Sequence, residues 1–237
     1  MPRWMVLAFV SVSLVLAGSL TMLYLMRGRM PATGPDTPSH RPPAAATPLT
    51  PDHLIADWDP IPAFSLIDQD GRPQTEALLD GRVTIVDFIF TNCPFACPGM
   101  TMEMSGLAES LKGTPVRFAS FTVDPQRDTP EQLKQFATEH GADTTRWTLL
   151  TGDFDTVKRI AQDTLKFAVS PDTTRPIELD DGTTMANVVH PTKLFLVGPD
   201  RRLIAMYEYT NPDDMLALKA RAKAAAELNE KQAGAGK

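Results

Sequence analysis

Residues 83–90 form an almost continuous run of β-branched, aliphatic and aromatic side chains, and the only two cysteines of the chain follow directly, at Cys93 and Cys97. A run of this kind is typical of a strand that is covered on both faces of a parallel or mixed sheet. Beyond the cysteines, apolar residues recur at helical spacing across residues 98–112, and Pro98 suits a first helical turn. The sequence therefore predicts an α/β fold in which both thiols lie at a strand-to-helix turn.

The position and spacing of the two thiols limit their chemistry. The unpaired amides at a helix start favour thiolate over thiol, and three intervening residues place Cys93 and Cys97 one helical turn apart. Such a pair can close a disulfide or bind one soft metal ion. A purely structural disulfide would close a small loop and constrain the unfolded chain only weakly, so a redox or metal-binding role is favoured. The spacing alone does not choose between these two roles.

The rest of the folded region alternates between strand-like and helix-like patterns. Strands at 83–90 and 116–123 flank the first helix, so we expect a parallel βαβ unit with a right-handed crossover. The remaining predicted elements are a β-hairpin within 63–79, a helix at 130–140, a strand at 146–150, a helix at 153–164, an irregular insertion at 170–187 that could be an arm or flap, a β-hairpin at 188–207 and a final helix running from 212 towards 231. This order describes an α/β domain with an N-terminal β-hairpin extension.

The loop after the second core strand supplies two candidates for the surroundings of the cysteines. Thr129, Pro130 and Gln132 make a capping box for the next helix, which accounts for that part of the loop. Asp124 and Arg127 are not needed for the cap, and they follow the carboxyl end of a strand, where α/β sheets place their sites. They either support the cysteine site or form a loop ion pair, and the sequence leaves both open.

The N-terminal quarter of the chain differs in composition from the rest. Residues 4–26 carry no charged side chain, and these 23 residues as a helix would extend roughly 34 Å, enough to cross a hydrocarbon core of about 30 Å. An uncleaved anchor is favoured over a signal peptide, whose apolar core usually has about 7 to 15 residues. We therefore expect one transmembrane helix as an anchor in residues 1–29, a proline-rich linker at 30–60, a folded domain at 61–231 and a flexible tail at 232–237.

The charge balance excludes some partners. The chain has 29 acidic and 23 basic residues, which gives a formal net charge of −6. An acidic chain is poorly suited to nucleic acid or anionic lipid as its main partner, so no nucleic-acid partner is expected. With 237 residues, of which 43% are hydrophobic, the chain can form one ordinary domain with a substantial core.

Three separated motifs, taken in order, resemble the Sco/SenC family of membrane-anchored copper chaperones, which have a thioredoxin-like fold. The motifs are the segment Cys93–Pro98, the loop at 122–130, and a lone histidine, His190, that opens the strand at 194–197. Their joint occurrence is far more specific than any one of them. The resemblance covers about residues 60–220.

The resemblance implies that Cys93, Cys97 and His190 are the copper ligands of a domain in the bacterial periplasm, held to the inner membrane by a single-pass helix. It also implies a role in assembling the dinuclear copper centre of cytochrome c oxidase, whose subunit II would be the copper acceptor. Soft thiolates suit Cu(I), and an added imidazole would allow Cu(II) to be held as well. Because oxidised cysteines must be reduced before they bind copper, a partner thiol reductase is also expected.

Three residues depart from the usual pattern of the family. Phe95 lies between the cysteines, where members commonly carry a polar and often acidic residue, and Val189 and Pro191 flank His190 in place of an aspartate and a serine. These more apolar surroundings could alter the redox potential, copper retention or choice of partner. We also expect a cis His190–Pro191 bond that packs beside the cysteines, as a cis proline does in thioredoxin-like reductases, so Pro191 joins the residues expected around the ligands.

Two other functions stay open. A thiol–disulfide oxidoreductase would use Cys93 as the attacking thiol and Cys97 as the resolving thiol. A thioredoxin-like redox sensor would need neither stable copper binding nor rapid exchange. The leading interpretation, a metallochaperone, requires no substrate turnover, and it differs from the oxidoreductase in its need for His190.

Overall fold

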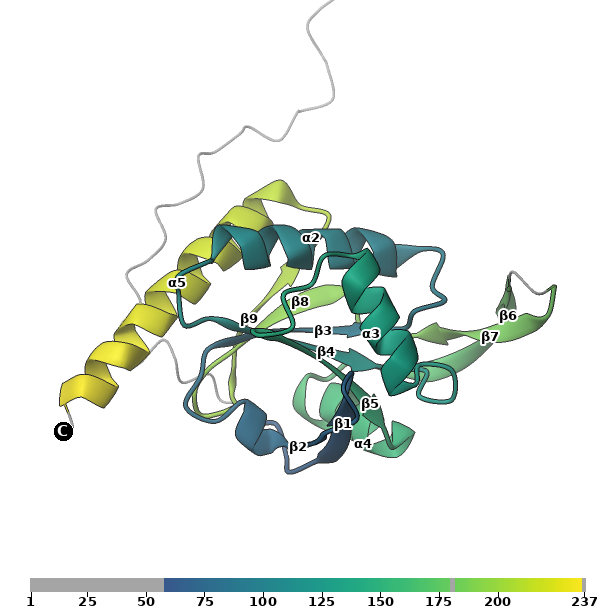
Figure 1. Cartoon of the computed structure of the whole chain (residues 1–237), viewed down its shortest axis with the longest axis horizontal. Helices are drawn as coiled ribbons and strands as arrows, with labels where there is room; N and C mark the ends of the chain where they lie inside the picture. The colour runs from purple at the N-terminus through teal and green to yellow at the C-terminus, as the bar shows by residue number, and fades with distance from the viewer. Residues whose placement is uncertain (1–57, 180–181, 236–237) are drawn as a thin grey trace, which may run out of the picture. The chain divides into compact units, whose positions relative to one another are not determined.

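The computed structural model describes residues 58–179 and 182–235, which fold around a mixed seven-stranded sheet with the strand order β2-β1-β5-β4-β3-β8-β9 (Figure 1). The strands of this sheet are β1 (Ser65–Asp68), β2 (Pro73–Thr75), β3 (Thr84–Ile89), β4 (Arg117–Thr122), β5 (Trp147–Gly152), β8 (Lys193–Val197) and β9 (Leu203–Glu208). The helical segments are the 3-10 turn η2 (Glu76–Leu78), α2 (Ala96–Ser110), α3 (Pro130–Glu139), α4 (Phe154–Arg159), the π-helical turn η3 (Ile160–Thr164) and α5 (Pro212–Ala235).

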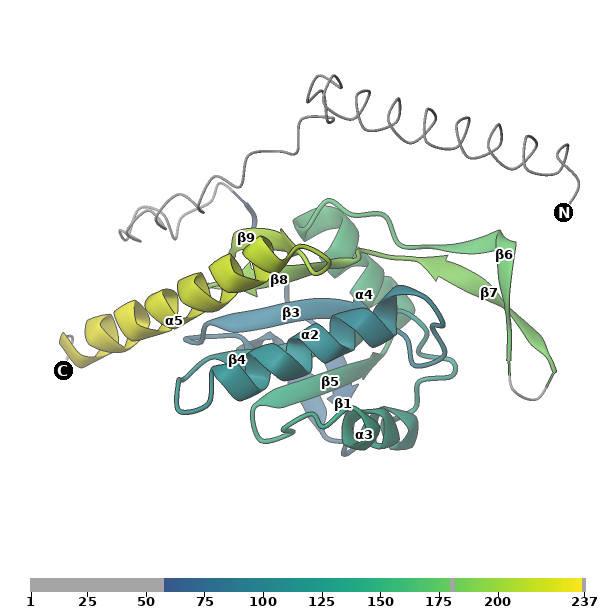
Figure 2. The same ribbon diagram turned by 90° about the horizontal axis from the view of Figure 1, so that it is seen from above.

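The strand before the cysteines, β3, lies inside the sheet, and all six of its residues are buried. It pairs in parallel with β4, which pairs in parallel with β5, while β8 joins the other edge of β3 in the antiparallel direction. Helices α2, α3 and α5 cover one face of the sheet, and α4 lies on the other (Figure 1, Figure 2). The predicted parallel βαβ unit is confirmed, and cover on both faces explains why residues 83–90 show almost no polar alternation.

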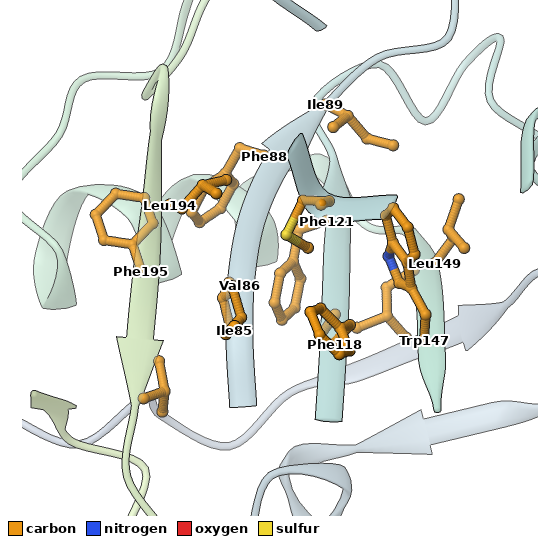
Figure 3. Close-up of a cluster of buried hydrophobic side chains, with 14 of the residues drawn as sticks. Ile85, Val86, Phe88, Ile89, Phe118, Phe121, Trp147, Leu149, Leu194 and Phe195 are labelled. Atoms are coloured by element: carbon orange, nitrogen blue, oxygen red, sulfur yellow. The ribbon is translucent and has the colours of Figure 1, made fainter. Parts of the chain in front are cut away.

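Aromatic side chains fill the core around β3 and β4 (Figure 3). Phe88 stacks on Phe121 with ring centroids 5.7 Å apart, and it meets Phe195 edge-on at 6.0 Å. Trp147 is buried and donates its indole N–H to Ser120 Oγ at 2.9 Å. Aromatic pairs of this kind contribute about 0.5–1.5 kcal/mol each beyond the area they bury, so the core holds β3 firmly in place below the cysteine turn.

The predicted irregular insertion is a two-stranded sheet, whose pairing register shifts between Asp172 and Ile177. Strand β6 (Ser170–Glu178) pairs antiparallel with β7 (Thr184–Val189), and we call this hairpin the arm. The arm projects beyond the main sheet at the end where α2 begins (Figure 1, Figure 2). Its paired residues Ile177 and Met185 are buried and join the hydrophobic core, whereas most of its other side chains face solvent.

The arm also changes where the next strand begins. Val189 is the last residue of β7, and β8 begins only at Lys193, so the predicted strand at 188–197 is divided between two sheets. Pro191 has no N–H to offer to a strand ladder, which explains a break at this point. The break leaves His190 in a short connection instead of inside a strand.

The structure describes only part of the predicted division into anchor, linker and domain. The anchor predicted in residues 1–29 lies outside the described residues, as does the linker up to residue 57. Within 58–179 and 182–235, no helix combines the length and the apolar character that a membrane crossing requires. At the other end, α5 continues to Ala235, past the domain limit predicted at 231.

Candidate metal-binding site

Both cysteines lie at the carboxyl end of β3, at the predicted strand-to-helix turn. Cys93 is in the loop, where its amide donates to Phe90 O at 3.2 Å. Helix α2 begins at Ala96, two residues earlier than expected, so Cys97 lies inside its first turn. The two cysteines are 8% and 1% exposed, and both thiols are free. The pair is therefore a reduced dithiol that is shielded from water, with Cys93 the more accessible of the two.

His190 approaches this dithiol from the connection between the arm and β8. Its Nδ1 is 2.9 Å from the carbonyl oxygen of Pro191. A carbonyl oxygen can only accept, so Nδ1 donates this hydrogen bond and Nε2 is the ring nitrogen left to face the sulfurs. Nε2 lies 3.8 Å from Cys97 Sγ, and the ring meets Phe90 edge-on with centroids 5.6 Å apart. The hydrogen bond and the Phe90 contact thus aim Nε2 at the sulfurs.

The two sulfurs and this imidazole form a compact set of ligand atoms. All three ligand atoms of Cys93, Cys97 and His190 lie within 4.8 Å of one another. Thiolate and imidazole donors suit soft and borderline metal ions such as Cu(I), and they are poor ligands for Mg²⁺ or Ca²⁺. The geometry can hold one such ion between segments that are more than ninety residues apart in the sequence.

The pKa values of the two thiols are shifted in opposite directions, so the two sulfurs have different roles. A hydrogen bond from the Cys97 thiol lowers the pKa of Cys93 to about 4, with help from His190 and from amides at the start of α2. The same hydrogen bond, together with burial, raises the pKa of Cys97 well above its usual value. Cys93 is therefore a thiolate at neutral pH, ready to act as a metal ligand or a nucleophile.

The other residues expected around the ligands differ in what they contact. Arg127 Nη1 is 3.2 Å from both carboxylate oxygens of Asp124, and the hydrogen bonds and ion pairs of these two side chains in the described residues do not reach either thiol. Pro191 is buried beside the site, where its carbonyl orients His190. The expected cis His190–Pro191 bond is wrong, because no peptide bond of the described residues is cis. With the bond in trans, the Nδ1–H hydrogen bond and the edge-on contact with Phe90 turn the ring towards Cys97.

Asp128 supports the cysteine loop, and the sequence analysis missed it. Its carboxylate accepts hydrogen bonds from the Thr91 amide at 3.2 Å, from the Thr91 hydroxyl at 2.6 Å and from the Thr122 hydroxyl. Asp128 is fully buried, and burial raises its pKa to about 6. One feature of the sequence could have indicated Asp128: it is an acidic residue directly before Thr129. Because Thr129 itself caps α3 by accepting a hydrogen bond from Gln132 N, Asp128 is not needed for the cap.

Replacing Asp128 with alanine is expected to loosen the loop that carries Cys93. The Thr91 amide would lose its acceptor, and an unsatisfied buried donor costs roughly 1–3 kcal/mol. Amide hydrogen exchange at Thr91 should therefore accelerate by about tenfold to a hundredfold. Asp124→Ala is the matched control, because the Asp124 carboxylate pairs with Arg127 instead of with Thr91. Equal protection of the Thr91 amide in the parent and in the Asp128 variant would contradict this role.

Asp87 is a second residue near the site that the sequence analysis passed over. It is fully buried within β3, and neither carboxylate oxygen has a hydrogen-bond partner of normal geometry in the described residues. Burial raises its pKa to about 7, and Ser120 and His190 counter this shift in part. The Asp87 charge also helps to raise the pKa of Cys97, although the hydrogen bond with Cys93 and burial have larger effects. The carboxyl group therefore lies within electrostatic reach of two of the three ligands.

Known proteins of one family are similar in sequence to this chain. A family model described as SCO1/SenC matches residues 57–225. The SCO1 protein homologue of Bacillus subtilis is 35% identical over 163 residues, which span 66% of this chain and 79% of that protein. A protein of Stutzerimonas stutzeri that is named for copper binding is 33% identical over 147 residues, which span 60% of this chain and 66% of that protein.

Solved structures share the fold as well. The SCO1/SenC family lipoprotein of Bacillus anthracis superposes with a TM-score of 0.61 and 31% identity, and the match covers 71% of this chain and 95% of that one. BsSco, a member of the Sco family of cytochrome c oxidase assembly proteins with a disulfide switch, gives a TM-score of 0.60, 30% identity and coverage of 72% and 95%. The predicted thioredoxin-like Sco fold is confirmed, and with a family match over most of its length, the chain belongs to the SCO1/SenC family.

Proposed function

We propose that this protein is a metallochaperone that binds one copper ion through Cys93, Cys97 and His190 and delivers it to an acceptor protein. The observation that carries the proposal is the convergence of the three ligand atoms within 4.8 Å of one another. The donor set suits copper, and the Stutzerimonas stutzeri relative is named for copper binding. A site of two sulfurs and one imidazole can hold Cu(I), and the imidazole also makes Cu(II) a possible cargo.

The residues around the ligands favour a site that is prepared for copper before it arrives. Cys93 is already a thiolate, so it can bind the ion without first losing a proton. The Pro191 carbonyl fixes the tautomer of His190, a hydrogen bond of the kind that orients metal-ligating histidines in other sites. The buried Cys97 closes the inner side of the site, so an incoming or departing ligand would approach from the side of Cys93.

The proposed acceptor is subunit II of cytochrome c oxidase, which holds a dinuclear copper centre. Support comes from BsSco, which is 30% identical and belongs to a family of cytochrome c oxidase assembly proteins. We place the protein in the bacterial inner membrane as a single-pass protein with its domain in the periplasm. The uncharged residues 4–26 support the membrane anchor, and the Bacillus anthracis relative is a lipoprotein.

A thiol reductase partner fits the same proposal, because a disulfide between Cys93 and Cys97 would remove both sulfur ligands. The alternative function, a thiol–disulfide oxidoreductase, is favoured by one observation, the low pKa of the more accessible Cys93. Neither that function nor a redox sensor needs an imidazole whose free nitrogen points at the sulfurs. The position of His190 therefore favours copper binding over both.

Anaerobic copper titration tests the proposal directly. The reduced protein should bind one Cu(I) per chain, and oxidation of Cys93 and Cys97 to a disulfide should abolish this binding because both thiolate ligands are then consumed. The free thiol count before each titration checks that the intended state is present. The same stoichiometry and affinity in the reduced and oxidised proteins would contradict the proposed ligand set.

A further inference from the structure

A groove lies beside the cysteines, between the start of α2 and the arm. It has a volume of about 350 Å³, and two of the proposed ligands line it. Its lining residues are Cys93, Phe95, Ala96, Arg175, Asn187, Val188, Val189, His190 and Thr192. We call this the ligand groove. The α2 side supplies Phe95 and Ala96, and the arm supplies Arg175 and residues 187–189.

Large apolar side chains are exposed along the ligand groove. Among the described residues, four large hydrophobic side chains are exposed, and two of them, Phe95 at 66% and Val189 at 45%, line this groove. The other two, Met102 at 69% and Leu216 at 63%, line a different groove between α2 and α5. Phe95 and Val189 thus place apolar surface on both sides of Cys93 and His190.

Helix stability does not explain Phe95. It occupies the N-cap position of α2, where it makes no side-chain capping hydrogen bond. Ser, Thr, Asp and Asn are preferred at this position, and a residue that cannot cap forgoes roughly 0.5–2 kcal/mol of helix stability. An exposed phenylalanine here therefore has no benefit for the isolated domain, and a binding partner that covers it would provide one.

Besides the Cys93 thiolate, the ligand groove carries one charged side chain, Arg175. In the described part of the chain, the Arg175 guanidinium makes no ion pair with a carboxylate. Its nearby carboxylate, Asp172, is hydrogen-bonded to the Thr174 amide and hydroxyl and to the Arg175 backbone, and it feels the Arg175 guanidinium only as a more distant charge. Arg175 is therefore free to attract an acidic group of a partner.

We infer that the ligand groove is the docking surface for the copper acceptor, which buries Phe95 and Val189 under apolar side chains and places a carboxylate against Arg175. This inference rests on the proposed function. Direct transfer requires an acceptor donor atom to reach the ion held by Cys93 and His190, so the acceptor must cover the residues around these two ligands. A bond from an acceptor thiolate to Cu(I) forms as the bond from Cys93 breaks. Copper stays Cu(I), and no electrons are transferred.

The test compares copper binding with copper transfer in the full chain. In the double variant Phe95→Ser/Val189→Ser, the affinity for Cu(I) should stay within about threefold of the parent, because both side chains are exposed and neither is a ligand, so their apolar character acts on the choice of partner instead of on copper retention. The Phe95 side chain makes no capping hydrogen bond, so its replacement removes no cap from α2. The rate of transfer to the soluble copper-binding domain of cytochrome c oxidase subunit II should fall at least about tenfold, in the range of buried apolar anchor residues of interfaces.

Two controls make the result specific. Met102→Ser/Leu216→Ser removes equally exposed apolar side chains outside the ligand groove, and it should leave the transfer rate unchanged. Transfer to a small Cu(I) chelator should be the same in both double variants, because a chelator needs no docking surface. Arg175→Glu should slow transfer to the protein acceptor and weaken its dependence on salt.

The possible failures can be told apart. If the parent protein does not bind Cu(I), the proposed function is wrong. If the parent binds and transfers copper while Phe95→Ser/Val189→Ser transfers it as fast, the proposed docking surface is wrong. Equal slowing by the Met102→Ser/Leu216→Ser control would also overturn the inference, because the effect would then not belong to the ligand groove.

Discussion

Replacing Cys93 or Cys97 with serine, or His190 with alanine, is expected to lower the affinity for Cu(I) at least about 100-fold. Loss of a residue that only orients a metal ligand typically costs about 10- to 100-fold, and loss of the ligand itself should cost more. The measurement is anaerobic competition between the reduced protein and a chromophoric Cu(I) chelator. The histidine variant is the most informative, because a dithiol that works only in thiol–disulfide exchange would keep its function without His190.

The chain offers a matched control for the histidine variant. His140 is the other histidine of the described residues, and its Nδ1 is 3.0 Å from the Phe136 carbonyl oxygen, a local contact similar to that of His190. His140 is not part of the three-residue cluster, so His140→Ala should bind copper as the parent does. Unchanged affinity in His190→Ala would remove the imidazole from the site and favour the oxidoreductase.

Replacing Asp87 with asparagine is expected to stabilise the fold by about 4 kcal/mol above pH 7. The pKa of this carboxyl is raised from 3.8 to about 7 in the folded state. A carboxyl whose folded pKa lies above its unfolded pKa binds more protons when folded, so its contribution to stability falls as pH rises from about 4 to 7. Three pKa units correspond to roughly 4 kcal/mol, and an asparagine cannot ionise. Urea unfolding of the parent and the variant at pH 4 and pH 8 measures the difference.

The gain should be confined to high pH and to this residue. At pH 4 the parent carboxyl is protonated when folded, and the two proteins should differ little. Asp68→Asn is a control, because Asp68 is also buried but accepts hydrogen bonds from Asp70 N, Arg72 N and Gln74 Nε2, which an amide cannot all replace. A gain at pH 8 for Asp68→Asn, or none for Asp87→Asn, would contradict the argument.

The core of the fold could be predicted because the spacing of apolar residues along the sequence follows which faces of each strand and helix are buried. The apolar run at 83–90 and the helical spacing after Cys97 led to the parallel β3–α2–β4 unit, which the structure confirms. The arm was described as irregular because most of its side chains face solvent and give no clear alternation of apolar and polar residues. The backbone pairing of its two strands, which includes a register shift between Asp172 and Ile177, defines the arm where its side-chain pattern does not.

The cysteine half of the site could also be predicted from the residues, whereas the histidine half depended on a family resemblance. Spacing places Cys93 and Cys97 one helical turn apart, but no local rule connects them with His190. Cα positions so far apart in sequence meet only through the order of strands in the sheet, in which β8 lies next to β3. The expected cis bond before Pro191 was wrong because it was carried over from reductases, while the ring here is oriented by a hydrogen bond.

The buried carboxylates show a second limit on what can be predicted from the sequence. Asp124 was a candidate because it follows a strand, yet it pairs with Arg127, while the unremarked Asp128 binds the cysteine loop through Thr91. A sequence shows that an acidic residue is near a strand end but not which donors its carboxylate meets. Asp87 could have been noticed, because a charged residue inside an apolar strand is costly unless it has a role.

The proposed function requires that two sulfurs and one imidazole bind one copper ion at the same time. X-ray absorption spectroscopy of the reduced, Cu(I)-loaded protein tests this most directly, because scattering from sulfur and from an imidazole ring can be separated. We predict two sulfur neighbours and one imidazole nitrogen in the parent, with the imidazole signal absent in His190→Ala and retained in His140→Ala. A spectrum of sulfur neighbours alone, or one identical in the parent and His190→Ala, would contradict the proposed site.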